Sequence, residues 1–298
     1  MQRLKGKVAV VTGASRGMGK GIALALAEQG ATIYVTGRTV CEGDHALPGT
    51  VSETARLINE RGGKGIAVPV DHNNDEAVAD LFSQIDREQG RLDLLVNNAI
   101  AIPKELTQSG AFWHKPITNW EMIDVGLRSN FVASWHAAQR MTEQKSGLIV
   151  SISGYVGVTY TYNVIFGTCK SATDRMARDM AIELLPYQVA SVSLWQGFTY
   201  TERAQSNLES VPGMASQLNS FAGSSVEFPG RVIAAMLLDD DLMSLSGASL
   251  ISAELAKRYG ISDIDGKTVP SLRSERGSPI WGPVKQEPAA AGTQGENR

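Results

Sequence analysis

Short runs of apolar and β-branched residues recur along the chain, and longer segments with helical periodicity separate them. Most of the short runs are nearly continuous in hydrophobicity rather than alternating, which is typical of parallel strands covered on both faces. The runs that predict strands are Val8–Thr12, Thr32–Thr36, Gly65–Val70, Leu92–Val96, Gly147–Ser153, Val189–Trp195 and Gly247–Ser252.

The intervening segments carry apolar residues at helical spacing. They are Gly19–Gln29, Val51–Arg61, Asp75–Gln89, Asn119–Gln144, Gly167–Leu185 and Glu227–Leu238. A strand followed by a helix, repeated six times, predicts an α/β fold with a three-layer, doubly wound parallel sheet. In such sheets the connections are right-handed, and a ligand binds at the carboxyl ends of the strands near the point where the strand order reverses.

The chain of 298 residues, 43% of them hydrophobic, is long enough for one domain with a substantial core. We expect this domain to span residues 1–282, with an insert near 100–120 that carries Phe112, Trp113 and Trp120. The insert either covers an apolar pocket or makes a packing or subunit contact. Residues 283–298 are rich in Pro, Gly, Ala and polar side chains and are expected to form a disordered tail.

Charge and cysteine content exclude several classes of protein. A net charge of −3 argues against nucleic-acid binding, and no apolar run reaches the roughly 20 residues of a membrane span. The first residues are interrupted by charge and glycine, unlike a signal peptide. Cys41 and Cys169 lie far apart in sequence, so no disulfide is expected and a reducing, cytoplasmic location fits. The four histidines and two cysteines show no metal-ligand spacing, so no metal is expected.

A glycine-rich turn joins the first predicted strand to the first predicted helix. Gly13 permits a tight turn, Gly17 lets the backbone approach a pyrophosphate, and Gly19 lets helix and strand pack closely. The N–H groups at the helix N-terminus would face the anion. The spacing is GxxxGxG, and the turn also contains Ser15, Arg16 and Met18, which we include among the candidate cofactor-binding residues.

The second predicted strand ends without the acidic residue that would accept hydrogen bonds from an adenosine 2′-hydroxyl. Gly37 and Arg38 stand there instead, and Arg16 lies in the first turn. Two guanidinium groups near one position favour a 2′-phosphate, and therefore NADP(H) over NAD(H). The alternative is that both arginines face solvent.

Five motifs in order resemble the short-chain dehydrogenase/reductase family: "TGASRGMG", "VD" at Val70–Asp71, "LVNNA" at Leu95–Ala99, "IVSIS" at Ile149–Ser153 and the helix lysine Lys170. The resemblance covers roughly Lys5 to Ser252 and implies a Rossmann-type fold and oxidoreductase activity. Four further segments resemble one branch of that family: "AFWHKP", "VGLRSNF", "SLWQGFTYTE" and "LAKRYGISDIDGK".

The resemblance also implies positions for the cofactor and for subunit contacts. Residues implied along the cofactor are Asp71 and His72 beside the adenine, Asn97 and Ala99 at the fourth strand, and Gly197, Thr199 and Thr201 near the nicotinamide. Gln196 replaces a proline usual in the family, and Ile100 replaces a glycine. A homodimer or homotetramer is implied, built on the segments Asn119–Gln144 and Gly167–Leu185.

The family's active site contains a serine that orients the substrate oxygen, a tyrosine that transfers the proton and a lysine that binds the nicotinamide ribose. Ser153 and Lys170 match by spacing, but Phe166 occupies the tyrosine position. Phenylalanine preserves volume yet has no proton to donate. The family's helix asparagine is also replaced, by Gly126.

Three explanations of Phe166 remain open. The chain is an engineered variant, or it recruits another donor among Tyr155, Tyr160, Tyr162 and Tyr200, or it binds NADP(H) without turnover. The expected function is NADP(H)-dependent hydride transfer to or from a small-molecule carbonyl or secondary alcohol. The alternative is a non-catalytic NADP(H)-binding or sensing protein.

Overall fold

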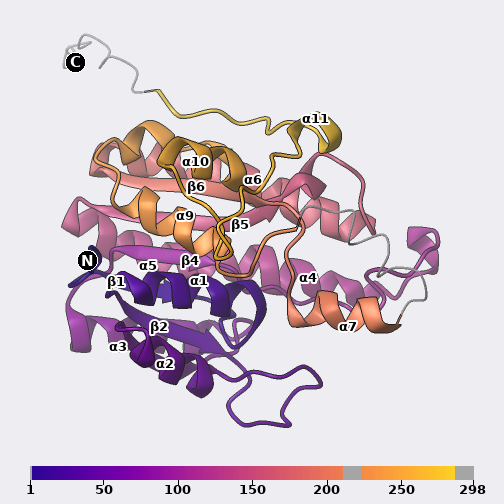
Figure 1. Cartoon of the computed structure of the whole chain (residues 1–298), viewed down its shortest axis with the longest axis horizontal. Helices are drawn as coiled ribbons and strands as arrows, with labels where there is room; N and C mark the ends of the chain where they lie inside the picture. Colours follow the sequence, from indigo (N-terminus) through magenta and orange to yellow (C-terminus); the bar gives the residue numbers. More distant parts are fainter. Residues whose placement is uncertain (1, 211–222, 286–298) are drawn as a thin grey trace, which may run out of the picture.

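The computed structural model describes residues 2–210 and 223–285. Its centre is one all-parallel sheet of seven strands in the order β3-β2-β1-β4-β5-β6-β7, which confirms the predicted doubly wound α/β fold (Figure 1). The strands are β1 (Val8–Val11), β2 (Thr32–Gly37), β3 (Lys64–Pro69), β4 (Leu94–Asn97), β5 (Gly147–Gly154), β6 (Val189–Gln196) and β7 (Ser249–Ile251).

The order of the strands reverses between β1 and β4. From β1 the chain moves outward through β2 to β3, then returns to the other side of β1 with β4 and continues to β7. Strand β1 pairs with both β2 and β4, and all four of its residues are buried. The loops that follow β1 and β4 therefore separate at this point and leave room for a ligand.

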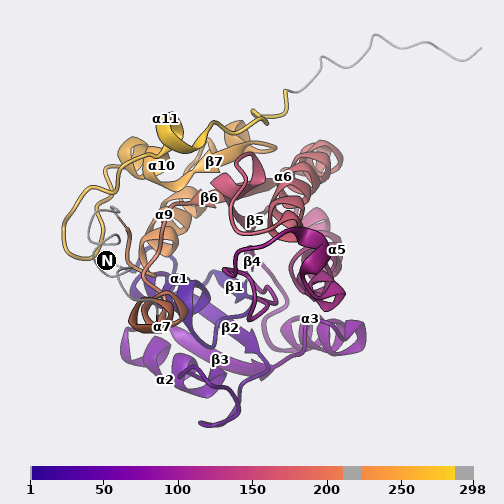
Figure 2. The same ribbon diagram turned by 90° about the vertical axis from the view of Figure 1, so that its right-hand side faces the viewer.

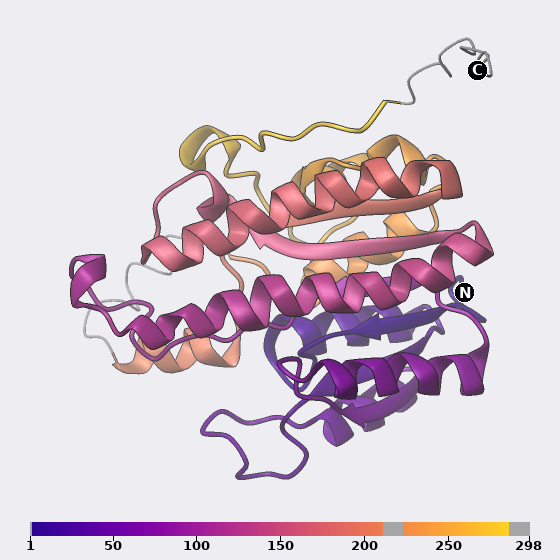
Figure 3. The ribbon, with the colours of Figure 1, turned by 180° about the vertical axis from the view of Figure 1, so that it is seen from behind.

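Helices cover both faces of the sheet (Figures 2 and 3). One apolar core packs beneath α1 (Gly17–Glu28), α2 (Val51–Glu60), α9 (Phe228–Leu237) and α10 (Ser252–Tyr259). The other lies beneath α3 (Asp75–Gln89), α5 (Ser129–Gln144) and α6 (Val164–Leu184). The other α-helices of the described residues are α4 (Glu121–Ile123), α7 (Glu202–Ser210) and α11 (Arg273–Arg276).

Side-chain caps fix where several helices begin. Thr50 accepts a hydrogen bond from Glu53 N at the start of α2, and Asn74 caps α3 in the same way. Asn163 Oδ1 accepts from Phe166 N at 2.7 Å, so α6 begins at Val164, three residues before the predicted start. These polar oxygens satisfy N–H groups that have no partner within the helix.

The prediction of one continuous helix over Asn119–Gln144 is wrong. A 3-10 turn over Ile117–Trp120 and α4 precede a break, where Val125 adopts the non-helical angles φ −110° and ψ 81°. The Val125 carbonyl accepts a hydrogen bond from Ala101 N at 2.6 Å, which ties the segment to the loop after β4. This tertiary contact overrides the local helical preference, and α5 starts only at Ser129.

The chain after α10 runs back along the β7 edge of the sheet. Ser249 N donates to Trp281 O at 3.0 Å, and Val284 N donates to Ser246 O at 2.8 Å. Residues 286–298 of the predicted tail lie outside the described residues. Among the residues that are described, no helix combines the length and apolar character that crossing a bilayer requires.

Candidate active site

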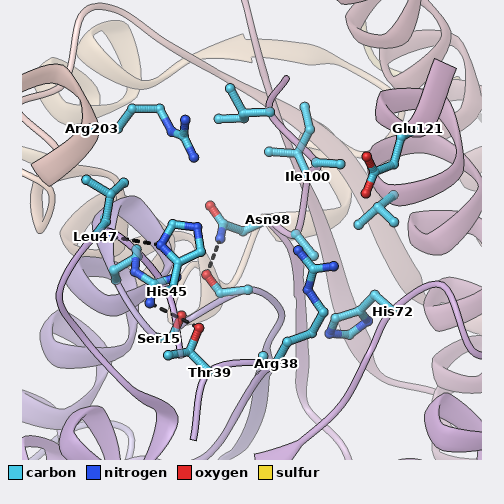
Figure 4. Close-up of a pocket in the computed structure, with 18 of the residues that line it drawn as sticks. Ser15, Arg38, Thr39, His45, Leu47, His72, Asn98, Ile100, Glu121 and Arg203 are labelled. Carbon is cyan, nitrogen blue, oxygen red and sulfur yellow. Dashed lines mark hydrogen bonds between the residues drawn. The ribbon is translucent and has the colours of Figure 1, made fainter. Parts of the chain in front are cut away.

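A cleft of about 760 Å³ lies at the carboxyl ends of the central strands (Figure 4). Segments that follow β1, β2, β3, β4 and β6 all contribute to its wall, as expected at the reversal of strand order. Predicted cofactor residues that line it are Gly13, Ser15, Arg16, Gly17, Met18, Arg38, Asp71, His72, Ala99 and Thr201.

The glycine-rich turn is packed so tightly that side chains are excluded. Gly13 has φ +63°, and a Cβ there would lie 2.8 Å from Ala99 Cα. A Cβ on Gly19 would lie 2.4 Å from Gly13 O. Real Cβ atoms do not approach other atoms this closely, so glycine at both positions allows the β1 turn, the start of α1 and the β4 loop to meet.

Asn98 holds the floor of the cleft together, although the sequence reasoning selected its neighbour. Its Nδ2 donates to Thr12 O at 2.8 Å and to Gly13 O at 3.0 Å, and it lines the cleft. Asn97 is fully buried and donates to Ser134 Oγ on α5 at 2.8 Å. Successive residues of an extended segment point to opposite sides. The twofold period at the end of β4 could therefore have shown that Asn97 and Asn98 point in different directions.

Arg16 and Arg38 both line the cleft but differ in their partners. The Arg16 guanidinium donates to Pro48 O at 2.9 Å, to Gly49 O at 2.7 Å and to Thr39 Oγ1 at 3.0 Å. It therefore fastens the loop after β2 to the glycine turn. Arg38 is exposed and makes no ion pair with any part of the chain that the structure describes.

Two further basic side chains, His45 and Arg203, border the same cleft (Figure 4). Burial lowers the pKa of Arg203 and also that of Arg16, where the charges of Arg203 and Arg38 act in the same direction. Burial lowers the pKa of His45, and the charges of all three guanidinium groups lower it further. Sequence reasoning missed His45 and Arg203 because they sit on loop and helix segments that carry no motif. Arg16, Arg38 and Arg203 thus bring three guanidinium groups, which suit phosphate, to a cleft wall that also carries carboxylates.

The structure brings Ser153, near the end of β5, together with Lys170 of α6. Lys170 Nζ donates to Ile152 O at 2.7 Å, and Ser153 Oγ lies 3.4 Å from Lys170 O. Both side chains are buried, and burial lowers the pKa of the Lys170 ammonium. Neither residue belongs to the described wall of the cleft, and the same holds for Gly197 and Thr199.

Phe166 lies in apolar surroundings one turn before Lys170. It belongs to a cluster with Ile100, Met122 and Cys169, and its ring centroid is 6.0 Å from that of Tyr162. No residue of this cluster carries a hydroxyl group, and Tyr162, which lies outside the cluster, is 45% exposed.

The other tyrosines named as possible donors are placed differently. Tyr155 is buried, and its hydroxyl accepts a hydrogen bond from Leu272 N at 3.0 Å, so it anchors the chain that follows α10. Tyr160 is 74% exposed, and the ring of Tyr200 packs edge-on against Phe198. Tyr162 is thus the tyrosine whose ring contacts Phe166.

Asp174 is a buried acid that the sequence reasoning did not select. Both of its carboxylate oxygens lie 3.0 Å from Trp195 Nε1, and burial raises its pKa. It follows Lys170 by four residues, so the helical spacing that paired Phe166 with Lys170 could have found it. Its position stabilises the packing of α6 on β6.

His72 is a neutral buried group at the adenine side predicted for the cleft. Its Nε2 lies 2.7 Å from Thr36 Oγ1, and its side chain is almost fully buried. Burial lowers its pKa to about 4, and the nearby Arg38 acts in the same direction. At neutral pH the imidazole is therefore uncharged, and protonation would place an unfavourable charge between β2 and the β3 loop.

This pKa predicts a pH-dependent loss of stability. The unfolded histidine binds a proton near pH 6.5 but the folded one only near pH 4, so the stabilisation is complete above pH 6.5 and is lost as the pH falls towards 4. Between pH 7 and pH 5 we expect a loss of about 2 kcal/mol from this group. His72→Gln should reduce the difference in unfolding free energy between these pH values by that amount, measured with urea. The exposed His114→Gln serves as control, and an unchanged pH dependence in His72→Gln would contradict the assignment.

Comparisons with known proteins agree with this geometry. The profile of the short chain dehydrogenase family matches residues 7–211. Dehydrogenase/reductase SDR family member 1 of Mus musculus is 40% identical over 276 residues, covering 89% of this chain and 86% of the relative, which confirms the resemblance to one branch of the family. The 3-oxoacyl-[acyl-carrier-protein] reductase FabG of Aquifex aeolicus is 31% identical over 202 residues, covering 67% and 77%.

Among solved structures, a putative short-chain alcohol dehydrogenase from Sinorhizobium meliloti superimposes with a TM-score of 0.67 at 28% identity, covering 84% of this chain and 96% of that one. The profile match extends over most of the sheet and over the glycine-rich turn described above. The chain belongs to the short-chain dehydrogenase/reductase family of oxidoreductases.

Proposed function

We propose that this protein is an NADP(H)-dependent oxidoreductase that transfers a hydride between the nicotinamide and a carbonyl or secondary alcohol. The observation that carries the proposal is the glycine turn closed against Ala99, with the exposed Arg38 at the rim of the same cleft. A dinucleotide needs both features, a close backbone approach for its diphosphate and a cation for its 2′-phosphate.

The residues present fit this cofactor. Gly17 opens α1 with φ +57°, and within the described chain Arg16 at the N-cap gives that helix no side-chain cap. The first N–H groups of α1 therefore suit a diphosphate. Asp71, His72 and Asn98 would border the adenosine part of the molecule, and Thr201 would approach from the opposite wall.

Arg38 is the group we assign to the 2′-phosphate. No carboxylate stands at the end of β2, where an NAD-selective site would hold the ribose hydroxyls. Arg16 supports this choice indirectly, because it fastens residues 39–49 beside Arg38. A guanidinium free of ion pairs in the described structure is available to bind phosphate oxygens in a bidentate manner.

The remaining chemistry falls to Ser153 and Lys170. Bound NADP(H) would supply or accept the hydride, Ser153 would orient the substrate oxygen, and the ammonium of Lys170 would hold the nicotinamide ribose. To reach the ribose, Lys170 has to share or exchange its hydrogen bond to Ile152 O. Phe166 cannot transfer the proton, which lowers the expected turnover by about 10²–10⁴-fold relative to a tyrosine.

The apolar cluster around Phe166 favours a second candidate, a protein that binds NADP(H) without turnover. Ile100, Met122 and Cys169 surround the position where a proton donor would stand. The proposal of an active enzyme is supported by the name of the Aquifex aeolicus relative, a 3-oxoacyl-[acyl-carrier-protein] reductase. If the protein is an enzyme, its substrate is a small molecule with a carbonyl or alcohol group.

The proposal includes self-association and a cytoplasmic location. Phe131 and Trp135 lie four residues apart on α5 with 52% and 53% exposure, and Ile182 on α6 is 51% exposed. These helices lie side by side (Figure 3), and their exposed apolar residues offer a face for a homodimer or homotetramer.

The proposed cytoplasmic location draws on the two cysteines. Cys41 and Cys169 are free thiols, which fits a reducing compartment.

Arg38→Ala should weaken NADP(H) binding by about 10–100-fold because a charge-assisted contact to the 2′-phosphate is lost. NAD(H), which lacks that phosphate, should lose less than about threefold. Isothermal titration calorimetry with both cofactors measures the difference. Lys104→Ala, which removes another positive charge from the cleft wall, is the control. Equal losses for the two cofactors would contradict the role of Arg38.

Phe166→Tyr should raise the rate of NADPH-dependent ketone reduction by about 10²–10⁴-fold while the dissociation constant of NADPH stays unchanged. The measurement is NADPH absorbance at 340 nm across a panel of ketones, aldehydes and quinones. If Tyr162 supplies the proton in the parent chain, Tyr162→Phe removes the residual activity and Tyr160→Phe does not. Normal NADPH binding by Phe166→Tyr without any reduction would favour the non-catalytic alternative.

Trp135→Glu should convert the oligomer to a smaller species, since a carboxylate on the apolar face of α5 cannot be buried unpaired. Sedimentation velocity gives the molecular mass. Trp113→Glu is a matched control, because Trp113 is 69% exposed but lies on the insert. Dissociation by Trp113→Glu alone would assign the subunit contact to the insert instead.

A further inference from the structure

The diphosphate site at the start of α1 is contacted by a carboxylate of the protein itself. Glu202 Oε2 accepts a hydrogen bond from Gly17 N at 2.9 Å. Gly17 is the first residue of α1, and Glu202 is the first residue of α7, 185 positions further along the chain. The N–H group that the glycine turn presents to an anion is therefore engaged by this side chain.

The contact compensates for features that α1 lacks. Helices α2, α3 and α6 begin with a side-chain cap from Thr50, Asn74 or Asn163. In the described structure α1 has no such cap from its own N-cap residue and no acidic residue in its first turn. A carboxylate at the N-terminus stabilises the helix through its dipole and its unpaired N–H groups. Glu202 supplies that charge from a distant segment.

The segment around Glu202 lies directly on the turn. A Cβ built on Gly17 would lie 3.6 Å from Thr201 Cγ2 and 3.7 Å from Glu202 Oε2. The space above Gly17 is thus filled by residues 201 and 202. One N–H cannot serve a carboxylate and a diphosphate oxygen at once, and two anions at this distance repel each other.

The next residue has the opposite charge. Arg203 lines the same cleft, and its charge acts on Arg16 and on His45. When Glu202 leaves the turn, the guanidinium of Arg203 in the same segment still lines the cleft. Displacement of Glu202 therefore removes a charge that repels the cofactor phosphates and retains one that attracts them.

We propose that Glu202 is an internal competitor for the diphosphate subsite, and that the cofactor must displace it to bind. This proposal rests on the dinucleotide binding proposed above. Displacement couples occupancy of the cleft to the position of the segment that follows β6, where Thr201 and the first residues of α7, Glu202 and Arg203, line the cleft wall.

The test compares the affinities of two ligands for the parent protein and for two variants. Glu202→Gln should bind NADP⁺ about tenfold more tightly than the parent, because the competing charge is lost. Adenosine 2′-monophosphate carries the 2′-phosphate but no diphosphate, so its affinity should change less than about twofold. Glu121→Gln is the matched control, since Glu121 is an acidic residue of the same cleft wall and, in the described structure, forms no hydrogen bond with the glycine turn. Calorimetry provides all dissociation constants.

A second variant and a second measurement guard against misfolding. Glu202→Asp shortens the side chain by one methylene and should also tighten NADP⁺ binding. Hydrogen exchange over residues 198–206 should increase when the parent binds NADP⁺, and should already be raised in ligand-free Glu202→Gln.

Two failures can be told apart. If the parent binds neither NADP(H) nor NAD(H), the proposed function is wrong. If the parent binds NADP⁺ and Glu202→Gln binds it no more tightly, or Glu121→Gln gives the same gain, the role of Glu202 is overturned while the proposed function stands. A similar gain for adenosine 2′-monophosphate would likewise overturn it, because the effect would then be one of general charge.

Discussion

The contact between Gly13 and Ala99 is the constraint on which the site depends. It joins the loops after β1 and β4 where the strand order reverses, and a Cβ at residue 13 would lie 2.8 Å from the Ala99 backbone. Asn98 locks the same junction by donating to Thr12 O and Gly13 O. Because these loops cannot separate or slide, the glycine turn, the rim arginines and the start of α1 keep fixed positions around one cleft.

The two sides of the cleft are held in different ways. Backbone and amide hydrogen bonds fix the β1 and β4 loops, whereas the wall formed by α7 touches the turn through one carboxylate. The surroundings of Phe166 differ again, because apolar side chains pack around it and the buried Lys170 donates a hydrogen bond to the backbone. For the function proposed above, the described structure therefore offers more groups for holding a dinucleotide than for transferring a proton.

The local sequence pattern was sufficient to predict the strands of the sheet, but it could not predict contacts between distant segments. Continuous apolar runs predicted all seven strands, and three glycines located the turn, because burial and close approach leave direct marks in sequence. The break at Val125 depends on a bond from Ala101 N, and Glu202 meets Gly17 across 185 residues. No local propensity reports such contacts, which is why the long helix was predicted wrongly and the acid on the turn was not foreseen.

The bond from Leu272 N to the Tyr155 hydroxyl has a consequence for how the chain matures. The two residues are 117 positions apart, so ribosomes adding roughly 5–20 residues per second produce Leu272 about 6–23 seconds after Tyr155. Until then the segment beside Ser153 lacks this support, as does the outer edge of β7, which receives Trp281. Strands β1 to β4 are thus synthesised early, whereas the segment around Ser153 gains this support only after Leu272 has been made.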